Sequence, residues 1–94
     1  YCREVEDALA AHPMIAEAAV IGIPDDKWGE TVKAFIVIQP GTTVTDAEIV
    51  EFCRDRIAGY KIPRVIEYVG SLPVLPTGKV NKVALRQQHS AAIH

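Results

Sequence analysis

Two short stretches of the sequence contain residue types suited to ligand binding and catalysis. The first is Pro76-Thr77-Gly78-Lys79, where a loop of proline and glycine presents a lysine. Glycine allows the backbone to come close to a ligand, and an ammonium on a flexible stem suits a phosphate or a carboxylate. The stretch is not a P-loop, because that pattern needs Gly at position 73 and Ser or Thr at position 80. Taken alone, these four residues are more typical of a solvated lysine after a turn.

The second stretch is Gly59-Tyr60-Lys61-Ile62-Pro63-Arg64, in which an aromatic ring and two cations gather at the end of a predicted helix. One interpretation is a site for an anionic ligand with a ring that stacks on Tyr60. The alternative, favoured without further context, is that the cations stabilise the helix dipole and Tyr60 covers the core. Trp28 lies in a polar turn, as either a lid over the core or a stacking surface.

The remaining residues that could support chemistry form no recognisable site. The spacing of His12, His89 and His94 predicts no metal centre, and no Ser/His/Asp or Cys/His arrangement is present. Cys53 is predicted to belong to the core. Cys2 and Cys53 form no CxxC pattern, so we expect a reduced, cytoplasmic protein.

Length and composition indicate one small domain. The chain has 94 residues, of which 49% are hydrophobic and 23% charged. Ten basic and twelve acidic residues give a net charge of −2, which argues against nucleic acid as a partner. The longest apolar run, residues 18–23, is too short for a transmembrane segment. The chain starts at Tyr1 rather than at a methionine, and we expect it to be a fragment of something longer.

The elements that position the two stretches follow from hydrophobic periodicity and from Pro and Gly. Helices are predicted at 2–12, 45–57 and 81–91, strands at 15–23, 30–38 and 65–69, and a loop at 70–78. This order predicts an α+β fold, a small sheet of about three strands flanked by helices.

Local patterns sharpen this prediction. Thr45 and Glu48 form a capping box, with the Thr hydroxyl and the Glu carboxylate each accepting from a free amide. The strand at 15–23 is apolar almost throughout, which predicts cover on both faces, and Pro24-Asp25-Asp26 is expected to end it. The strand at 30–38 alternates, with Val32, Ala34, Ile36 and Ile38 on one face and Thr31, Lys33, Phe35 and Val37 on the other. The buried stripe of the helix at 45–57 is predicted to be Ile49, Phe52, Cys53 and Ile57.

Taken together and in order, six stretches resemble the C-terminal domain of the acyl-CoA synthetases, a branch of the adenylate-forming (AMP-binding) enzyme superfamily. No single stretch is specific, but six in register over nearly the whole chain are. They are Tyr1-Cys2-Arg3-Glu4-Val5-Glu6, Ala18-Ala19-Val20-Ile21-Gly22-Ile23-Pro24-Asp25, Lys27-Trp28-Gly29-Glu30, Phe35-Ile36-Val37, Ala58-Gly59-Tyr60-Lys61-Ile62-Pro63, and Leu72-Pro73 through Pro76-Thr77-Gly78-Lys79.

The resemblance implies a two-step ligase. A large N-terminal domain of the same enzyme would hold ATP, Mg²⁺ and a carboxylic acid, and the small domain would close on it for acyl-adenylate formation. The small domain would then rotate so that CoA displaces AMP. The 94 residues alone are expected to be inactive. The implied residues are Lys79 for adenylation, on a loop of Pro76, Thr77 and Gly78, and Trp28, Tyr60, Lys61 and Arg64 for CoA.

Three readings of the function stay open at this point. The first is an acyl-CoA ligase acting on a fatty or related apolar acid, which the basic ending at 82–89 weakly favours. The second is a member that serves a carrier protein, although Trp28 and Arg64 favour CoA, because a carrier protein offers no adenine and no 3′-phosphate. The third is a non-catalytic interaction domain, which the intact Lys79 loop argues against. The sequence departs from related members at Ile62, where they have a second cation. The sequence also does not determine the identity of the acid or the oligomeric state.

Overall fold

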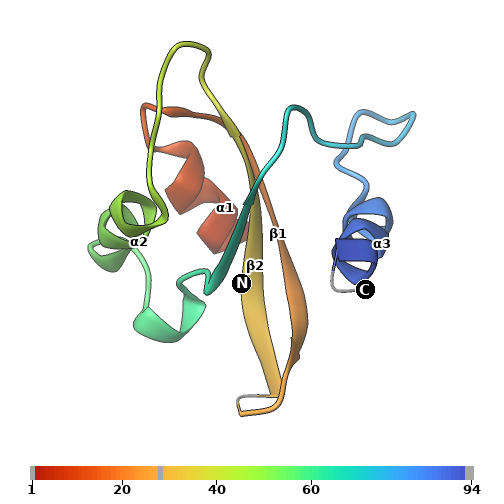
Figure 1. The fold of residues 1–94 in the computed structure, drawn as a ribbon, viewed down its shortest axis with the longest axis horizontal. Helices are drawn as coiled ribbons and strands as arrows, with labels where there is room; N and C mark the ends of the chain where they lie inside the picture. Colours follow the sequence, from red (N-terminus) through yellow and green to blue (C-terminus); the bar gives the residue numbers. More distant parts are fainter. Residues whose placement is uncertain (1, 28, 93–94) are drawn as a thin grey trace.

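The computed structural model describes residues 2–27 and 29–92, which form helices on both faces of a small sheet (Figure 1). Their order agrees with the predicted one, except that a short 3₁₀ turn, η1, was not predicted. The elements are α1 (Cys2–Ala10), β1 (Ile15–Asp25), β2 (Gly29–Ile38), α2 (Asp46–Arg54), η1 (Gly59–Lys61), β3 (Val65–Tyr68) and α3 (Lys82–Ala92). The predicted α+β fold is therefore confirmed.

The sheet has the strand order β1-β2-β3, with β2 in the centre. β1 and β2 are antiparallel, whereas β2 and β3 are parallel. A parallel pair needs a crossover connection, and here α2 supplies it. Helices α1 and α2 cover one face of the sheet and α3 covers the other (Figure 1).

The strand β1 runs further than predicted. Pro24 pairs with Glu30, and Asp25 pairs with Gly29. A proline is tolerated here because β1 is an edge strand, where a missing N–H on the outer side breaks no ladder hydrogen bond. Pro24-Asp25-Asp26 does end the strand in a turn, as predicted, but the last paired residue is Asp25 rather than Ile23.

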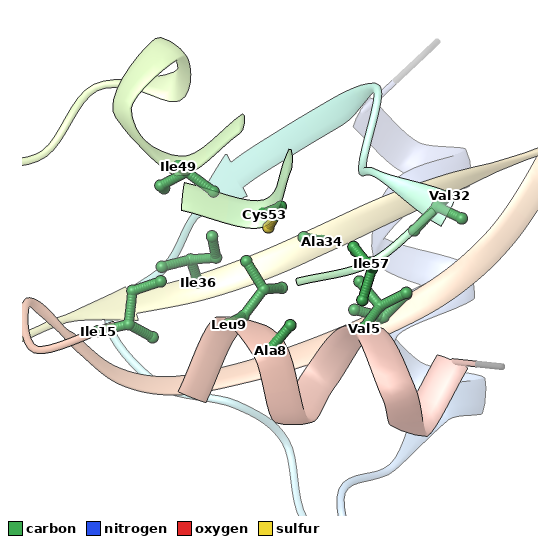
Figure 2. Close-up of a cluster of buried hydrophobic side chains, with 11 residues drawn as sticks. Val5, Ala8, Leu9, Ile15, Val32, Ala34, Ile36, Ile49, Cys53 and Ile57 are labelled. Atoms are coloured by element: carbon green, nitrogen blue, oxygen red, sulfur yellow. The ribbon is translucent and has the colours of Figure 1, made fainter. Parts of the chain in front are cut away.

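The first core lies between the sheet and the helices α1 and α2 (Figure 2). Its members come from the apolar stripes of both helices and from the even-numbered face of β2. They are Val5, Ala8, Leu9, Ile15, Val20, Val32, Ala34, Ile36, Ile49, Cys53 and Ile57. Full burial of one such aliphatic side chain is worth about 1.5–3 kcal/mol.

The second core lies between the sheet and α3. It contains Ala19, Ile21, Ile23, Phe35, Leu72 and Leu85, and the polar Thr31 and Lys33 are also buried on this face of β2. β1 contributes to both cores, which confirms that it is covered on both faces. The predicted alternation of β2 is confirmed as well.

Phe52 departs from the predicted stripe of α2. It is only partly buried, with its ring 4.6 Å from the ring of His12 and 3.6 Å from the guanidinium carbon of Arg56. A step of three residues turns a helix by 300°, which places Phe52 about 60° away from the line of Ile49. Phe52 therefore lies at the margin of the core, and the prediction that it is an interior residue was wrong.

The capping box of α2 forms in a modified way. The amide of Glu48 donates to the Thr45 hydroxyl at 3.2 Å, as predicted. The Glu48 carboxylate, however, accepts from that same hydroxyl at 3.1 Å, in place of the backbone amide that we expected. The helix also ends at Arg54, three residues early, although Ile57 remains buried beyond it.

We expect Leu9→Ala to lower the free energy of unfolding by about 2–5 kcal/mol, because it opens a cavity between α1 and the sheet. Urea denaturation measures this change. The matched control is Val83→Ala, since Val83 is 66% exposed and its truncation should change the free energy by less than about 0.5 kcal/mol. Equal effects of the two variants would contradict the core described above.

Candidate functional site

Lys79 follows a tight turn made by residues 76–78. The amide of Gly78 donates to the carbonyl of Leu75 at 2.8 Å, and the amide of Leu75 donates to the carbonyl of Lys79 at 2.7 Å. Gly78 has φ +91°. These features match a three-residue hairpin loop that ends in a left-handed glycine. The backbone of Lys79 is thus fixed by hydrogen bonds on the turn itself.

Gly78 is required by backbone conformation rather than by crowding within the chain. A Cβ placed on Gly78 would meet no other atom within 4 Å. Residues other than glycine adopt this positive φ only at a cost in free energy, because their Cβ comes too close to the backbone.

The side chain of Lys79 is exposed, as predicted. It has no ion pair or hydrogen bond with the rest of the described chain. An ammonium presented in this way is available to an anion from outside this domain.

The ends of the Lys79 loop are tied to each other and to α3. Val74 pairs with Val80 in an isolated bridge, and the amide of Asn81 donates to the carbonyl of Pro73 at 2.8 Å. The Asn81 side chain then accepts from the amide of Ala84 at 3.1 Å, which caps the start of α3. The loop and the start of α3 are therefore joined by hydrogen bonds into one structural unit.

A second set of contacts ties the start of α3 to the edge of the sheet. The ammonium of Lys82 donates at 2.5 Å both to Glu6 of α1 and to the carbonyl of Val20. The same Glu6 oxygen accepts from the amide of Val20 at 2.8 Å. Because β1 is an edge strand, these side chains satisfy backbone groups that have no partner strand.

Part of the stretch at 59–64 lines a groove of 360 Å³ beside α2, to which Tyr60 and Lys61 do not contribute. Tyr60 is 75% exposed and Arg64 is exposed. Two arginines line the groove, Arg64 and Arg54 of α2. Its lining residues are Val50, Arg54, Gly59, Ile62, Pro63 and Arg64.

The sequence does not single out Arg54, because its position in the helix marks it only as a solvent-facing residue. It pairs with Glu51 at 3.2 Å, as an ordinary surface arginine does. Arg54 and Arg64 line the same groove because the turn η1, which was not predicted, folds the chain back against the end of α2.

Lys61 is turned toward α1 rather than into the groove. Its ammonium donates to Glu4 at 2.7 Å and lies 5.6 Å from the centre of the Tyr60 ring. The hydrogen bond to Glu4 raises the pKa of Lys61. Trp28, the remaining predicted CoA residue, lies outside the described residues.

The structure does not bring Lys79 together with Tyr60 and Arg64. The Lys79 loop lies on the side of the sheet that α3 covers, and the segment at 59–64 lies on the side of α2 (Figure 1). The candidate site therefore consists of two separate parts.

Other chemistry-bearing groups add nothing to these two parts. No cluster of three His, Cys, Asp or Glu side chains that could hold a metal occurs in residues 2–27 and 29–92, and His94 lies outside them. Over the same residues, no helix is long and apolar enough to cross a membrane. Cys53 is a buried free thiol whose pKa is raised by burial, in agreement with the predicted core role.

Comparison with protein families decides the family of the chain. The model of the AMP-binding enzyme C-terminal domain matches residues 4–79. The chain belongs to this family. The predicted resemblance is thereby confirmed, and the chain is a C-terminal domain of an adenylate-forming enzyme.

Relatives of this AMP-binding C-terminal domain include named CoA ligases. It is 47% identical over 88 residues to the 3-[(3aS,4S,7aS)-7a-methyl-1,5-dioxo-octahydro-1H-inden-4-yl]propanoyl:CoA ligase of Rhodococcus jostii, covering 94% of this chain and 17% of the relative. It is 42% identical over 93 residues to the long-chain-fatty-acid–CoA ligase FadD13 of Mycobacterium tuberculosis, covering 99% and 18%. The chain thus spans less than a fifth of the length of these curated relatives.

Solved structures of similar fold include a fatty acyl CoA synthetase from Mycobacterium tuberculosis, with a TM-score of 0.89 and 41% identity. That match covers 98% of this chain and 18% of the other. The amide bond synthetase McbA from Marinactinospora thermotolerans has a TM-score of 0.90 and 39% identity, over 94% and 18%. The same AMP-binding C-terminal fold thus occurs in enzymes named for different products.

We expect Gly78→Ala to destabilise the Lys79 turn, because the left-handed conformation of an alanine is less favourable in free energy by about 1–2 kcal/mol. Hydrogen exchange of the Leu75 amide, measured by NMR, should become about tenfold faster, since 1.4 kcal/mol corresponds to a factor of ten. Gly70→Ala is the matched control in the same loop, because Gly70 has no positive φ and open space around it. Unchanged exchange in Gly78→Ala would show that the turn does not depend on the left-handed glycine.

Proposed function

We propose that this chain is the mobile C-terminal domain of an ATP-dependent acyl-CoA ligase. The overall reaction joins a carboxylic acid to CoA, with conversion of ATP to AMP and pyrophosphate. The observation that supports this most directly is the Lys79 turn, which presents an ammonium with no partner in the rest of the described chain. Family membership and the named CoA ligases among the relatives support it as well.

In the first half-reaction, a carboxylate oxygen attacks the α-phosphorus of ATP, and the bond to pyrophosphate breaks. This brings several negative charges together, and a cation fixed at that point stabilises the transition state. We propose Lys79 for this role. The acid, ATP and Mg²⁺ would be held mainly by the N-terminal domain of the same enzyme, with the metal neutralising phosphate charge.

The turn suits the task because its backbone is rigid while the side chain is free. A rigid backbone fixes where the ammonium arrives, which reduces the entropy lost at the transition state. Pro76, Thr77 and Gly78 would therefore act as the presenting loop.

In the second half-reaction, the thiol of CoA attacks the acyl carbon, and AMP leaves. We propose that the groove at 59–64 receives the nucleotide part of CoA, with Arg54 and Arg64 toward phosphate oxygens. Tyr60 would lie along the nucleotide and Trp28 would stack on adenine. Lys61 would assist from its position beside Glu4.

The distance between the two parts fits a reaction in two steps. A lysine needed only for adenylation and a groove needed only for CoA can lie on different sides of the domain, provided that the domain turns between the steps. This supports the domain rotation that the family resemblance implies.

The acid is proposed to be a fatty or related apolar acid, since two relatives are named for fatty acids. The relative from Rhodococcus jostii is instead named for a ring-bearing propanoate. The free cysteines Cys2 and Cys53 support the proposal that the enzyme is cytoplasmic.

A second candidate is an enzyme that passes the acyl group to a different acceptor, such as a carrier protein. The likeness to an amide bond synthetase is the observation that favours it. The pair of arginines at the groove favours CoA, because only CoA brings several phosphates. A non-catalytic interaction domain is disfavoured, because such a domain has no need of an exposed lysine on a fixed turn.

We expect Lys79→Ala in the full-length enzyme to slow acid-dependent ATP–pyrophosphate exchange by about 10²–10³-fold, as loss of one preorganised donor does. Thioester formation from a pre-made acyl-adenylate should be unchanged, because Lys79 acts only in the first step. Single-turnover kinetics of each half-reaction measures both effects. Arg86→Ala is the control for an exposed cation nearby, and equal loss in both half-reactions would refute the assignment.

Arg54→Ala and Arg64→Ala should each raise the apparent KM for CoA by about tenfold or more, since a hydrogen bond to a charged group is worth about 1.5–3 kcal/mol. Trp28→Ala should have an effect of similar size through lost stacking, about 1–3 kcal/mol. Pyrophosphate exchange should stay at the wild-type rate. With pantetheine, which lacks the nucleotide, all three variants should match the wild type, and a defect that persists with pantetheine would place these residues outside the nucleotide site.

A further inference from the structure

Lys33 is a buried ammonium in the middle of β2. Its side chain is 3% exposed and lies beneath α3, 4.7 Å from the centre of the Phe35 ring. It donates to Glu67 of β3 at 2.9 Å and makes a second contact of 2.9 Å with Nδ1 of His89 on α3. A buried ammonium is costly unless it is paired, so these two partners are what makes this position tolerable.

The contact with His89 requires a neutral imidazole. An ammonium has only N–H donors, so Nδ1 of His89 must offer a lone pair and the ring proton must sit on Nε2. A protonated ring carries N–H on both nitrogens. It would set a second positive charge 2.9 Å from the first and would remove the acceptor.

Glu67 attracts a protonated His89 and so counteracts part of the repulsion, but it cannot replace the acceptor that Lys33 loses. Glu67 is the carboxylate nearest to both cations, but it already accepts from Lys33, and from Gln88 at 2.9 Å. The hydrogen bond from Lys33 lowers the pKa of Glu67, which keeps it ionised wherever imidazoles titrate. The side chains of β1 that face α3 are the apolar Ala19, Ile21 and Ile23. Glu17 on the same strand is exposed and has no ion pair with any described residue. Arg86 on α3 is exposed as well.

α3 connects this cluster to the Lys79 turn. The helix starts with the Asn81 cap, whose amide closes the loop, and with Lys82, which is tied to Glu6 and Val20. His89 lies two turns further along the same helix. The direction in which α3 crosses the sheet therefore depends on contacts at both places.

We propose that Lys33, Glu67 and His89, the Lys33 cluster, form a proton-sensitive contact that positions α3, and with it the Lys79 turn, on the sheet. With His89 neutral, the contact holds α3 in place. With His89 protonated, α3 loosens and Lys79 loses its fixed position. The effect on catalysis rests on the function proposed above, whereas the effect on α3 does not.

His89→Gln is the decisive variant, because the glutamine oxygen can accept from Lys33 at every pH. Imidazoles titrate between about pH 5 and 8, so wild type and variant are compared at pH 8.0 and pH 5.5. The full-length enzyme is studied by hydrogen exchange, with protection expressed relative to the intrinsic exchange rate at each pH. In the wild type, α3 should lose about tenfold protection at pH 5.5, the loss expected for one hydrogen bond to a charged group, and His89→Gln should lose none.

The helix α2 is the internal reference, since it packs on the opposite face of the sheet, whereas α1 is joined to α3 by the contact of Glu6 with Lys82. Lys33→Met, which fills the space without donating, should leave α3 loose at both pH values. Equal acid loss in wild type and His89→Gln would overturn the proposal.

The pH profile of pyrophosphate exchange provides the second readout. The wild type should fall about 10–100-fold below His89→Gln at pH 5.5, because a small displacement of a catalytic group costs that much, while the thioester step should not differ. A changed α3 with identical exchange profiles would overturn the positioning of Lys79. Absence of exchange with any acid at pH 8.0 would refute the proposed ligase, and the protection data would still decide the Lys33 cluster.

Discussion

β2 lies between two neighbouring strands and between two layers of helices, so its central residues, 31–36, are all buried. Its even-numbered residues fill the core beneath α1 and α2, and its odd-numbered residues face α3. Because both faces carry residues that need cover, α3 has to return across the sheet after β3 has been added. The loop that makes this return is the segment that presents Lys79, so the position of the lysine follows from the cover that β2 needs.

Periodicity was sufficient for the order of the elements, since each helix and strand buries a face that its own spacing specifies. It failed where the environment comes from a distant segment. Phe52 lies at the margin of the stripe of α2 by spacing, and the ring that it meets there belongs to His12, 40 residues earlier in the chain. The extension of β1 through Pro24 depended on an edge position that no local pattern reveals.

The two parts of the candidate site differ in how far the sequence predicts them. The exposure of Lys79 could be predicted because its turn is made by consecutive residues, and its role was implied by the family resemblance. The groove beside Arg64 could not be predicted with its second arginine, because Arg54 reaches it only through the turn η1. The partners of Lys33 could not be predicted from the sequence either, because Glu67 and His89 are 34 and 56 residues away along the chain.

The contact of Lys82 with Glu6 and Val20 has a mechanical consequence. It connects the last helix to the first around the free edge of β1, over a separation of 76 residues. The base of the Lys79 loop is therefore joined to α1 directly, by a path that does not run through the sheet. A change in the angle of α1 would then reach the backbone that carries Lys79 through a single side chain.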